Sequence, residues 1–440
     1  MSERFDVAIV GAGPGACIAA YALAKAGLSV VMFERGDAPG SKAMFGGVLY
    51  TPILARLFPD FHTSGCVERH VVEKRFALLS ESNEVSAGFR FCDFEPPYFN
   101  HSFTALRARF DRWLASRAEE AGAMLITATV VDEVLRKEEQ IVGVRARREG
   151  GEVYANVVIA ADGANSLLAK QAGLRRELPL SVILGVKEVV SLPREVIEDR
   201  FNLEGDEGAA IEYIGGEAVK GLMGAAFIYT NKDTLSVGFG CPLHALKQSQ
   251  QQPRELLNAF KQHPCVRRLL RGTSPEEYAA HLIPELGPQD LPRLVTGGMV
   301  VIGGAAGLVN ANPIFHEGTN MAMASGLLAA EAIIEAHKRG DFSAHTLGRY
   351  EQRLRQSFAW QDMERYQRLT LMAEEHPRLF GSYPQQLAAM ARKLMTVAAT
   401  DADYQIPKRQ LELDVLDHFL AEIGVFSFMR DVADFGRALL

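Results

Sequence analysis

Cysteine is scarce in this sequence, and its spacing excludes a metal-cluster motif. The 440 residues include five cysteines, at positions 17, 66, 92, 241 and 265, so the closest two are 24 positions apart. An iron–sulfur cluster requires several cysteine thiolates, usually at short spacings. We therefore expect that this chain does not supply a cluster by itself. An odd number of dispersed cysteines also favours buried structural thiols over a disulfide framework.

Excess positive charge and long apolar runs are also missing. The formal net charge is −7, whereas a nucleic-acid-binding protein needs a basic face. Proteins and small molecules are therefore the favoured partners. The most apolar later stretch, residues 294–309, contains five glycines and is typical of strand, turn and helix start rather than a membrane span. The N-terminus has no basic leader or cleavage site. These absences predict a cytoplasmic protein without a transmembrane helix, with peripheral contact at the inner face of the cytoplasmic membrane left open.

What the sequence does contain is a glycine-rich turn between an apolar strand, expected at Asp6–Gly11, and a helix from about Gly15 to Ala26. The turn reads Gly-Ala-Gly-Pro-Gly-Ala over residues 11–16 and fits the pattern G-x-G-x-x-G/A. Its glycines permit a tight turn and close approach of a diphosphate to the helix N-terminus. Glu34 ends the next strand, expected at Ser29–Glu34, where a carboxylate accepts hydrogen bonds from ribose hydroxyls and repels a 2′-phosphate. This region predicts an adenine dinucleotide site.

Three later segments favour FAD over NAD, because the riboflavin end of FAD needs supports far from the first turn. Residues 107–111 read Arg-Ala-Arg-Phe-Asp before an expected helix at Phe110–Ala121, residues 161–166 read Ala-Asp-Gly-Ala-Asn-Ser, and residues 303–307 read Gly-Gly-Ala-Ala-Gly. Each segment alone is also explained as a turn or a helix cap. Their order after the N-terminal turn favours a single FAD site.

These segments resemble flavoproteins with the p-hydroxybenzoate-hydroxylase-like fold. Further motifs at residues 40–42, 46–50, 185–189, 198–201 and 318–326 are similar to the FixC family, relatives of electron-transfer flavoprotein:quinone oxidoreductase. One departure concerns the late glycine motif, where many FAD enzymes of this fold have Gly-Asp and this chain has Gly-Gly. The quinone-oxidoreductase relatives also lack that aspartate, so the departure weakens an aromatic-monooxygenase interpretation more than FAD binding.

The resemblance implies one bound FAD, no metal, and two candidate catalytic residues, His316 as a proton donor and Lys42 as a positive charge near the cofactor. An exposed loop lysine and a hydrogen-bonded loop histidine are the alternatives. The helix expected at Met321–Ala336 would point its N-terminus at the flavin and stabilise negative charge there. The residues expected to bind the cofactor are Gly11, Ala12, Gly13, Pro14, Gly15, Ala16, Glu34, Arg35, Lys42, Gly46, Gly47, Arg107, Val130, Ala161, Asp162, Gly163, Gly303, Gly304, Ala305, Gly307, Gly318, Thr319 and Asn320.

The expected fold is α/β: a Rossmann-like FAD-binding domain with an inserted, mostly antiparallel β-sheet substrate domain and a helical C-terminal region. The expected division places three parts of the FAD-binding domain at residues 1–70, 101–180 and 293–345. Substrate-domain strands are expected at 71–100, the inserted domain at 181–292, and the helical region at 346–440. Apolar spacing in segments 383–397 and 419–440 fits a core-facing helix, a partner contact or a membrane-surface contact.

The function implied by the resemblance is electron transfer. A FixC-like enzyme accepts electrons from an electron-transfer flavoprotein and passes them towards a quinone. A small ferredoxin-like protein would supply the iron–sulfur cluster, and the assembly could take part in electron bifurcation. The alternatives are a geranylgeranyl-reductase-type enzyme that reduces isoprenoid double bonds, an aromatic monooxygenase, and a non-catalytic assembly subunit stabilised by FAD.

Overall fold

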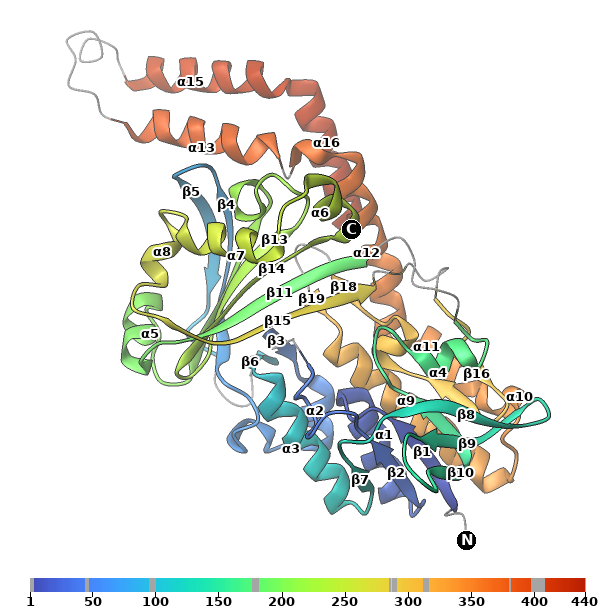
Figure 1. Ribbon diagram of the computed structural model, residues 1–440. Coiled ribbons are helices and arrows are strands. Elements are labelled where there is room, and N and C mark those ends of the chain that lie inside the picture. The colour runs from blue at the N-terminus through green and yellow to red at the C-terminus, as the bar shows by residue number, and fades with distance from the viewer. Residues whose placement is uncertain are drawn as a thin grey trace.

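The computed structural model contains two large β-sheets and a helical C-terminal region, which follow one another along the molecule (Figure 1). It describes residues 4–43, 47–94, 100–175, 182–284, 286, 291–311, 316–379, 381–396 and 408–439. The sheet that contains the N-terminal strand lies at one end, the second sheet in the middle, and the last helices at the other end (Figure 1). The expected α/β class with a helical C-terminal region is confirmed.

The first sheet has eight strands, six of them in the order β16-β17-β10-β1-β2-β7. The five strands β17, β10, β1, β2 and β7 are parallel, and the hairpin β8–β9 pairs with β10. Parallel strands need cover on both faces, which explains their continuous apolar sequences. The strands are β1 (Arg4–Val10), β2 (Val30–Phe33), β7 (Met124–Ile126), β8 (Val131–Lys137), β9 (Gln140–Ala146), β10 (Glu152–Ala160), β16 (Val295–Thr296) and β17 (Met299–Val301).

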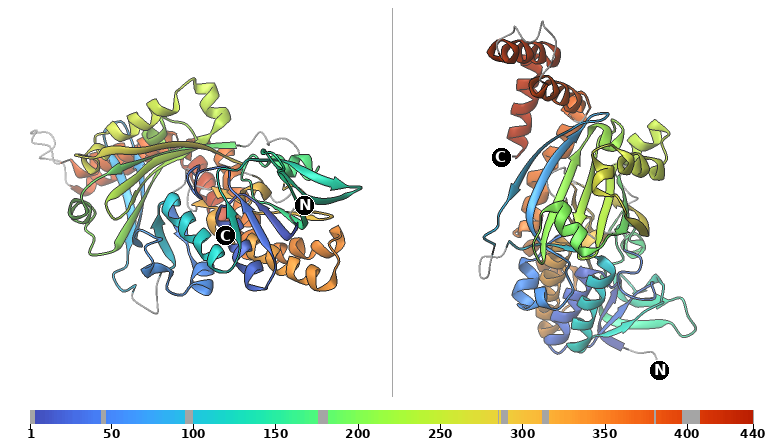
Figure 2. Two further views of the ribbon diagram at one scale, coloured as in Figure 1. Left: turned by 60° about the horizontal axis from the view of Figure 1, so that its bottom comes forward. Right: turned by 90° about the vertical axis from the view of Figure 1, so that its left-hand side faces the viewer.

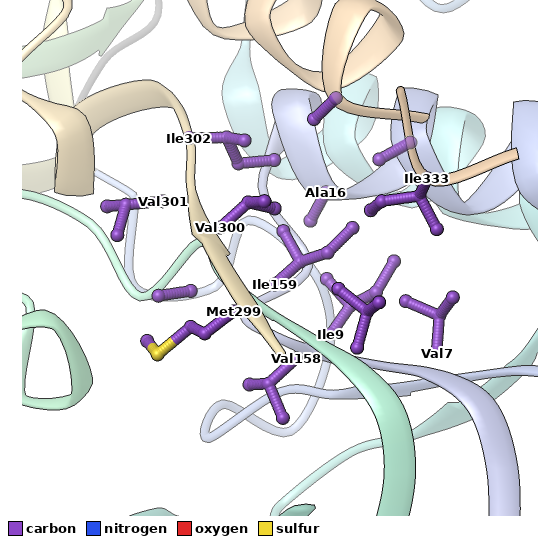
Figure 3. Close-up of a cluster of buried hydrophobic side chains, with 14 of the residues drawn as sticks. Val7, Ile9, Ala16, Val158, Ile159, Met299, Val300, Val301, Ile302 and Ile333 are labelled. Atoms are coloured by element: carbon purple, nitrogen blue, oxygen red, sulfur yellow. The ribbon is translucent and has the colours of Figure 1, made fainter. Parts of the chain in front are cut away.

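The core of this unit lies between the first sheet and its helices. Side chains of Val7, Ile9, Ile159 and Val300 are fully buried, and Ile333 of a covering helix packs among them (Figure 3). Helices α1 and α9 contact each other so closely that a Cβ atom on Gly326 would lie 2.1 Å from the carbonyl oxygen of Gly15. The helices of this part are α1 (Pro14–Lys25), α2 (Pro52–Leu57), α3 (Arg107–Glu120), α4 (Leu167–Gln171) and α9 (Thr319–Arg339).

The second sheet has nine strands in the order β15-β11-β14-β13-β12-β4-β6-β3, with β5 paired to β4. All its pairs are antiparallel except β12 with β4, so the expected mostly antiparallel sheet is present. The strands are β3 (Gly47–Tyr50), β4 (His70–Leu79), β5 (Glu84–Arg90), β6 (Ser102–Ala105), β11 (Val182–Ser191), β12 (Glu207–Ile214), β13 (Ala225–Thr230), β14 (Thr234–Pro242) and β15 (Ser274–Pro284).

Helices cover one face of the second sheet and leave the other face towards the first sheet (Figure 2). Ile197, Leu257 and Phe260 from these helices are buried against Ile211 and Tyr213 of β12. The helices are α5 (Arg194–Phe201), α6 (Leu243–Ser249), α7 (Pro253–Gln262) and α8 (Val266–Leu269). The expected domain division stays a prediction, but β3 and β6, which it assigned to the FAD-binding domain, pair within the second sheet.

The C-terminal helices form an arm beyond the second sheet, and α13 and α15 lie side by side at its tip (Figures 1 and 2). Tyr383, Phe419 and Ile423 form its small buried core. Asp431 joins α16 to the rest, since it accepts hydrogen bonds from the Tyr383 hydroxyl (2.7 Å) and contacts His376 Nδ1 (2.8 Å). The helices of the arm are α13 (Ser382–Met395), α15 (Lys408–Ile423) and α16 (Val425–Leu439), and α12 (Phe358–Glu375) leads to it. Helices α10 (Ala344–Leu347) and α11 (Arg349–Arg355) pack instead on the first unit, where Leu347 and Tyr350 join its core (Figure 1).

Two expectations from composition have structural counterparts. Among the helices that the structure describes, none has the length and apolarity needed to cross a membrane. Cys17, Cys66 and Cys241 are buried, as expected, but Cys92 is exposed and Cys265 is partly exposed. The expectation of buried thiols is therefore wrong for the last two positions, where the β5 end and the start of α8 meet solvent.

Candidate functional site

A cavity of about 570 Å³ lies between the two sheets. Its floor is made by the carboxyl ends of strands β1, β2 and β10, where open α/β sheets bind ligands. The residues expected to bind a cofactor that line it are Gly11, Ala12, Gly13, Pro14, Gly15, Ala16, Glu34, Arg35, Lys42, Arg107, Val130, Ala161, Asp162, Gly163, Gly303, Gly304, Gly318, Thr319 and Asn320. His316, an expected catalytic residue, also lines it.

The glycine turn has the geometry that an adenine dinucleotide requires. Gly11 has φ +105°, and a Cβ atom there would lie 2.3 Å from the carbonyl oxygen of Ala161, so only glycine fits. At Gly13 an added Cβ atom would meet nothing nearer than Arg107 Nη2 at 4.0 Å, because this position faces the cavity. No side chain caps α1. Its first N–H groups are left for an anion at the positive end of the helix.

Glu34 joins the end of β2 to the glycine turn. Its Oε2 accepts a hydrogen bond from the N–H of Ala12 at 3.1 Å, and its Oε1 accepts one from the N–H of Gly36 at 2.7 Å. Each carboxylate oxygen can accept more than one hydrogen bond, so the group can still accept hydrogen bonds from ribose hydroxyls. Arg35 and Val130 line the same end of the cavity, which fits the adenosine half of the cofactor.

The charged groups nearest to Gly13 largely neutralise one another. Arg107 donates to both carboxylate oxygens of Asp111, from Nε at 2.7 Å and from Nη2 at 2.6 Å. Such a bidentate pair fixes the guanidinium in one orientation. Lys42 lines the cavity but is exposed, so the structure is compatible with both the cofactor contact and the exposed loop lysine. The attraction for a diphosphate therefore comes mainly from backbone N–H groups and the dipole of α1.

Asp162 and the late glycine motif meet on the opposite wall. Asp162 accepts hydrogen bonds from Ser166 Oγ (2.5 Å) and from the N–H of Leu168 (3.2 Å), while burial raises the pKa of its carboxyl group. Gly303 has φ +57° and donates its N–H to Ser325 Oγ at 2.9 Å. These contacts hold both segments at the cavity, although the late glycine motif lacks the aspartate that many FAD enzymes of this fold have there.

Three of the expected cofactor residues that the structure describes do not line the cavity. Ala305 is fully buried in a short 3₁₀ turn, and the N–H of Gly307 donates back to Gly304 within that turn. An added Cβ on Gly307 would lie 2.4 Å from Leu286, so its role is packing. Neither residue lines the cavity, and cofactor contact at these two positions stays a prediction. Gly47 lies in β3 behind the cavity wall, and Gly46 is outside the described residues.

The N-terminus of α9 opens into the same cavity, and the first turn of this helix packs against Gly15 of α1. Gly318, Thr319 and Asn320 line this cavity, and no side chain caps the helix. Asn320 Nδ2 donates to Glu317 Oε1 at 3.2 Å. Burial raises the pKa of Glu317, and the charge of Asp362 raises it further. The positive helix end therefore remains available to stabilise negative charge on a bound ring.

His316 lies beside Glu212 of the second sheet. Its Nδ1 is 3.6 Å from Glu212 Oε1, too far for a hydrogen bond. Its side chain is 25 % exposed, so neither role expected for His316 is excluded. Among the residues that the structure describes, no group of His, Cys, Asp and Glu has the arrangement of a metal site.

Sequence reasoning missed most of the second-sheet wall of the cavity. The alternating pattern of these strands predicted a sheet, but it did not tell which face meets the first unit. The wall residues from β11, β13, β14 and β15 are Ile183, Gly185, Ala225, Phe227, Tyr229, Phe239, Gly240, Cys241, Pro242, His281, Leu282, Ile283 and Pro284. The wall is mostly apolar, which suits a flat ring system and excludes water from one side of it.

Comparison with known proteins agrees with this geometry. The family model FAD dependent oxidoreductase matches residues 6–180, and the ETF-QO/FixC family C-terminal domain matches residues 369–440. Protein FixC of Bradyrhizobium diazoefficiens is 40% identical over 100% of this chain and 99% of its own length. Protein FixC of Azotobacter vinelandii is 39% identical, with 100% of each chain covered.

Solved structures share the fold at lower identity. A geranylgeranyl bacteriochlorophyll reductase-like protein from Thermoplasma acidophilum superimposes with a TM-score of 0.67 at 21% identity, covering 96% of this chain and 99% of the other. The myxobacterial chondrochloren halogenase CndH, described as a variant of FAD-dependent halogenases, gives a TM-score of 0.61 at 20% identity over 100% of this chain and 91% of its own. At these identities the likeness concerns the fold.

Proposed function

The chain belongs to the FixC family and is an FAD-dependent oxidoreductase, and from this premise we propose that it accepts electrons from an electron-transfer flavoprotein and passes them towards a quinone. The observation that carries the proposal is one cavity lined by both the dinucleotide-binding turn and the uncapped N-terminus of α9. FAD, when bound, supplies the electron-transfer chemistry at its flavin ring.

The residues of this chain position the cofactor and set its surroundings. Gly11 and Gly13 admit the diphosphate, Glu34 holds the ribose, and the N-terminus of α9 favours negative charge at the flavin end. That charge preference makes the reduced, anionic form of the cofactor more stable and raises its tendency to accept electrons. The apolar wall on β13 and β14 keeps water from the ring.

A second cavity of about 240 Å³ suits the acceptor. It shares Val48, Tyr50, Tyr229 and His316 with the first cavity and extends along β4 and β5. Phe89 and Phe91 line it and are 60% and 50% exposed. An apolar mouth next to the flavin end fits a quinone ring and tail, and exposed phenylalanines fit peripheral contact with a membrane surface.

The C-terminal arm suits a protein partner. Its exposed apolar side chains include Phe426 (91%), Met395 (82%) and Met429. Exposed apolar residues that gather on one element mark interaction sites. We assign this surface to the electron-transfer flavoprotein or to the small ferredoxin-like protein that would supply a cluster. Electron bifurcation would then be a property of the assembly of these proteins and not of this chain alone.

Anaerobic titration tests the proposal. FAD-loaded protein is mixed in turn with reduced electron-transfer flavoprotein, with NAD(P)H and with a short-chain ubiquinone analogue, and the flavin spectrum is followed. We expect reduction by the flavoprotein and reoxidation by the quinone. Rapid reduction by NAD(P)H, with no response to the flavoprotein, would overturn the proposal. In Phe426→Asp we expect slower reduction by the flavoprotein and unchanged reoxidation by the quinone. In Phe89→Ser we expect the opposite, namely unchanged reduction and slower reoxidation.

The apolar wall also supports a second candidate, an enzyme of the geranylgeranyl-reductase type. Phe227, Phe239 and Ile283 give the site an apolar surface on which an isoprenoid chain could lie. This candidate predicts reduction of a prenyl double bond without a partner protein. Yellow protein that no donor reduces would instead favour an assembly subunit that binds FAD structurally.

A further inference from the structure

Glu212 is a carboxyl group buried where the two cavities meet. It lies on β12 and lines the second cavity, while its neighbours Tyr229 and His316 line both. Glu212 is only 3% exposed. A carboxylate in such a place costs free energy unless it is paired or takes up a proton. The position therefore demands an explanation that packing alone does not provide.

The two oxygens of this carboxyl group have different surroundings. Oε1 accepts a hydrogen bond from the Tyr229 hydroxyl at 2.6 Å and lies 3.6 Å from His316 Nδ1. Oε2 is buried and has no hydrogen-bond partner within the described part of the chain. A buried oxygen without a partner is rare in folded proteins and usually has a functional reason. Here it belongs to a residue that lines the cavity proposed for the acceptor.

Titratable groups face Glu212 from every neighbouring element. Burial raises the pKa of Tyr50 and of Tyr229, so both hydroxyls stay protonated at neutral pH. Burial also lowers the pKa of Lys74, which lies on the adjacent strand β4. The groups around this carboxyl are Tyr50 on β3, Lys74 on β4, Tyr229 on β13, both residues of the short strand β19 (His316–Glu317), and Asp362 and Tyr366 on α12 beyond Glu317.

We propose that Glu212 is the proton donor to the acceptor that occupies the second cavity, and that His316 returns the proton to it. This inference rests on the proposed function, which it deepens by naming the group that delivers the proton. Glu212 lines the second cavity, and the Tyr229 hydroxyl holds its Oε1 in place. His316 is partly exposed and needs only a small movement to reach hydrogen-bond distance from Oε1.

The stoichiometry of quinone reduction requires such a donor. A quinone becomes a quinol by taking up two electrons and two protons. FAD, when bound in its reduced form, would supply both electrons and one of these protons. One more proton must be supplied, and the carboxylic acid of Glu212 gives it and becomes a carboxylate. A proton from solvent then passes through the imidazole of His316 to the carboxylate and completes the cycle.

Glu212→Gln is the direct test, because the amide keeps the shape and the hydrogen bond from Tyr229 but carries no exchangeable acid. In the FAD-loaded variant, reduced with dithionite, we expect reoxidation by a short-chain ubiquinone to slow about 100-fold and to lose its pH dependence. Glu212→Asp should keep a pH-dependent rate. Glu207→Gln at the other end of β12 is the matched control and should behave as the wild type.

Two measurements that do not depend on turnover separate proton donation from binding. Infrared spectra of the FAD-loaded and FAD-free protein should contain a deuterium-sensitive carboxylic-acid band that Glu212→Gln lacks. Binding of a redox-inactive quinone analogue should be equally tight in both proteins. If Glu212→Gln and the wild type have equal reoxidation rates and pH profiles, or if the infrared band is unchanged in the variant, the assignment of Glu212 is overturned but the proposed function is not. A wild-type protein that quinone fails to reoxidise overturns the proposed function, and the assignment falls with it.

Discussion

Replacement of Gly13 by valine should weaken FAD binding and leave the fold intact. Gly13 precedes α1 with φ −77° and ψ 176°, a conformation that any residue adopts. An added Cβ atom would meet only Arg107 Nη2 at 4.0 Å, on the side of the cavity. The free energy of unfolding of the FAD-free protein should therefore change by less than about 1 kcal/mol.

The cost falls on the cofactor, because the new side chain occupies space that the diphosphate needs. Overpacking a fitted site costs about 1–3 kcal/mol, which weakens the dissociation constant for FAD roughly ten- to hundredfold. Gly11→Ala is the contrasting variant. Its Cβ would lie 2.3 Å from the carbonyl oxygen of Ala161 at φ +105°, so the fold itself should lose more than about 2 kcal/mol.

Two assays on the same preparations separate these effects. Denaturant unfolding of FAD-free protein measures stability, and fluorescence titration with FAD measures the dissociation constant. Our reasoning would be refuted by a Gly13→Val protein that binds FAD as tightly as the wild type. It would also fail if Gly13→Val lowered FAD-free stability as much as Gly11→Ala does, because Gly13 would then serve the fold and not the cofactor.

Further predictions concern the buried charges. Arg69 is fully buried and donates to four backbone carbonyl groups and to Glu198, so Arg69→Met should cost about 3–5 kcal/mol in denaturant unfolding, and a loss below 1 kcal/mol would contradict this. Burial lowers the pKa of Lys187 to about 8 from its ordinary value of 10.5. Lys187→Met should therefore stabilise FAD-free protein by up to about 3 kcal/mol at pH 7. Between pH 8 and 10.5 the unfolded chain binds more protons than the folded one, so wild-type stability rises and this advantage should shrink as pH increases; a constant advantage would disprove it. Asp431→Asn should loosen the C-terminal arm, seen as faster proteolysis after residue 376 with unchanged FAD binding, because Tyr383 and His376 both contact this carboxylate.

Much of the first unit could be predicted because its signals are local. The expected strand at residues 6–11, helix at 15–26 and strand at 29–34 correspond to β1, α1 and β2 within one or two residues at most ends. Strong apolar runs and glycine turns act over neighbouring residues. The role expected for Ala305 and Gly307 in the late turn stays a prediction, because sequence does not show whether an N–H group faces a ligand or its own turn.

Sequence by itself determined the dinucleotide-binding turn, because the conformation of Gly11 and the space at Gly13 depend on the absence of a side chain, which is written in the residue type. Tertiary structure alone decided the chemistry opposite that turn. The parallel pairing of β12 with β4 places Glu212 beside Lys74, and β19 carries His316 to the same point. Such contacts join residues far apart in the chain, and their geometry depends on strand register and on how two sheets face each other. Neither quantity is set by local sequence.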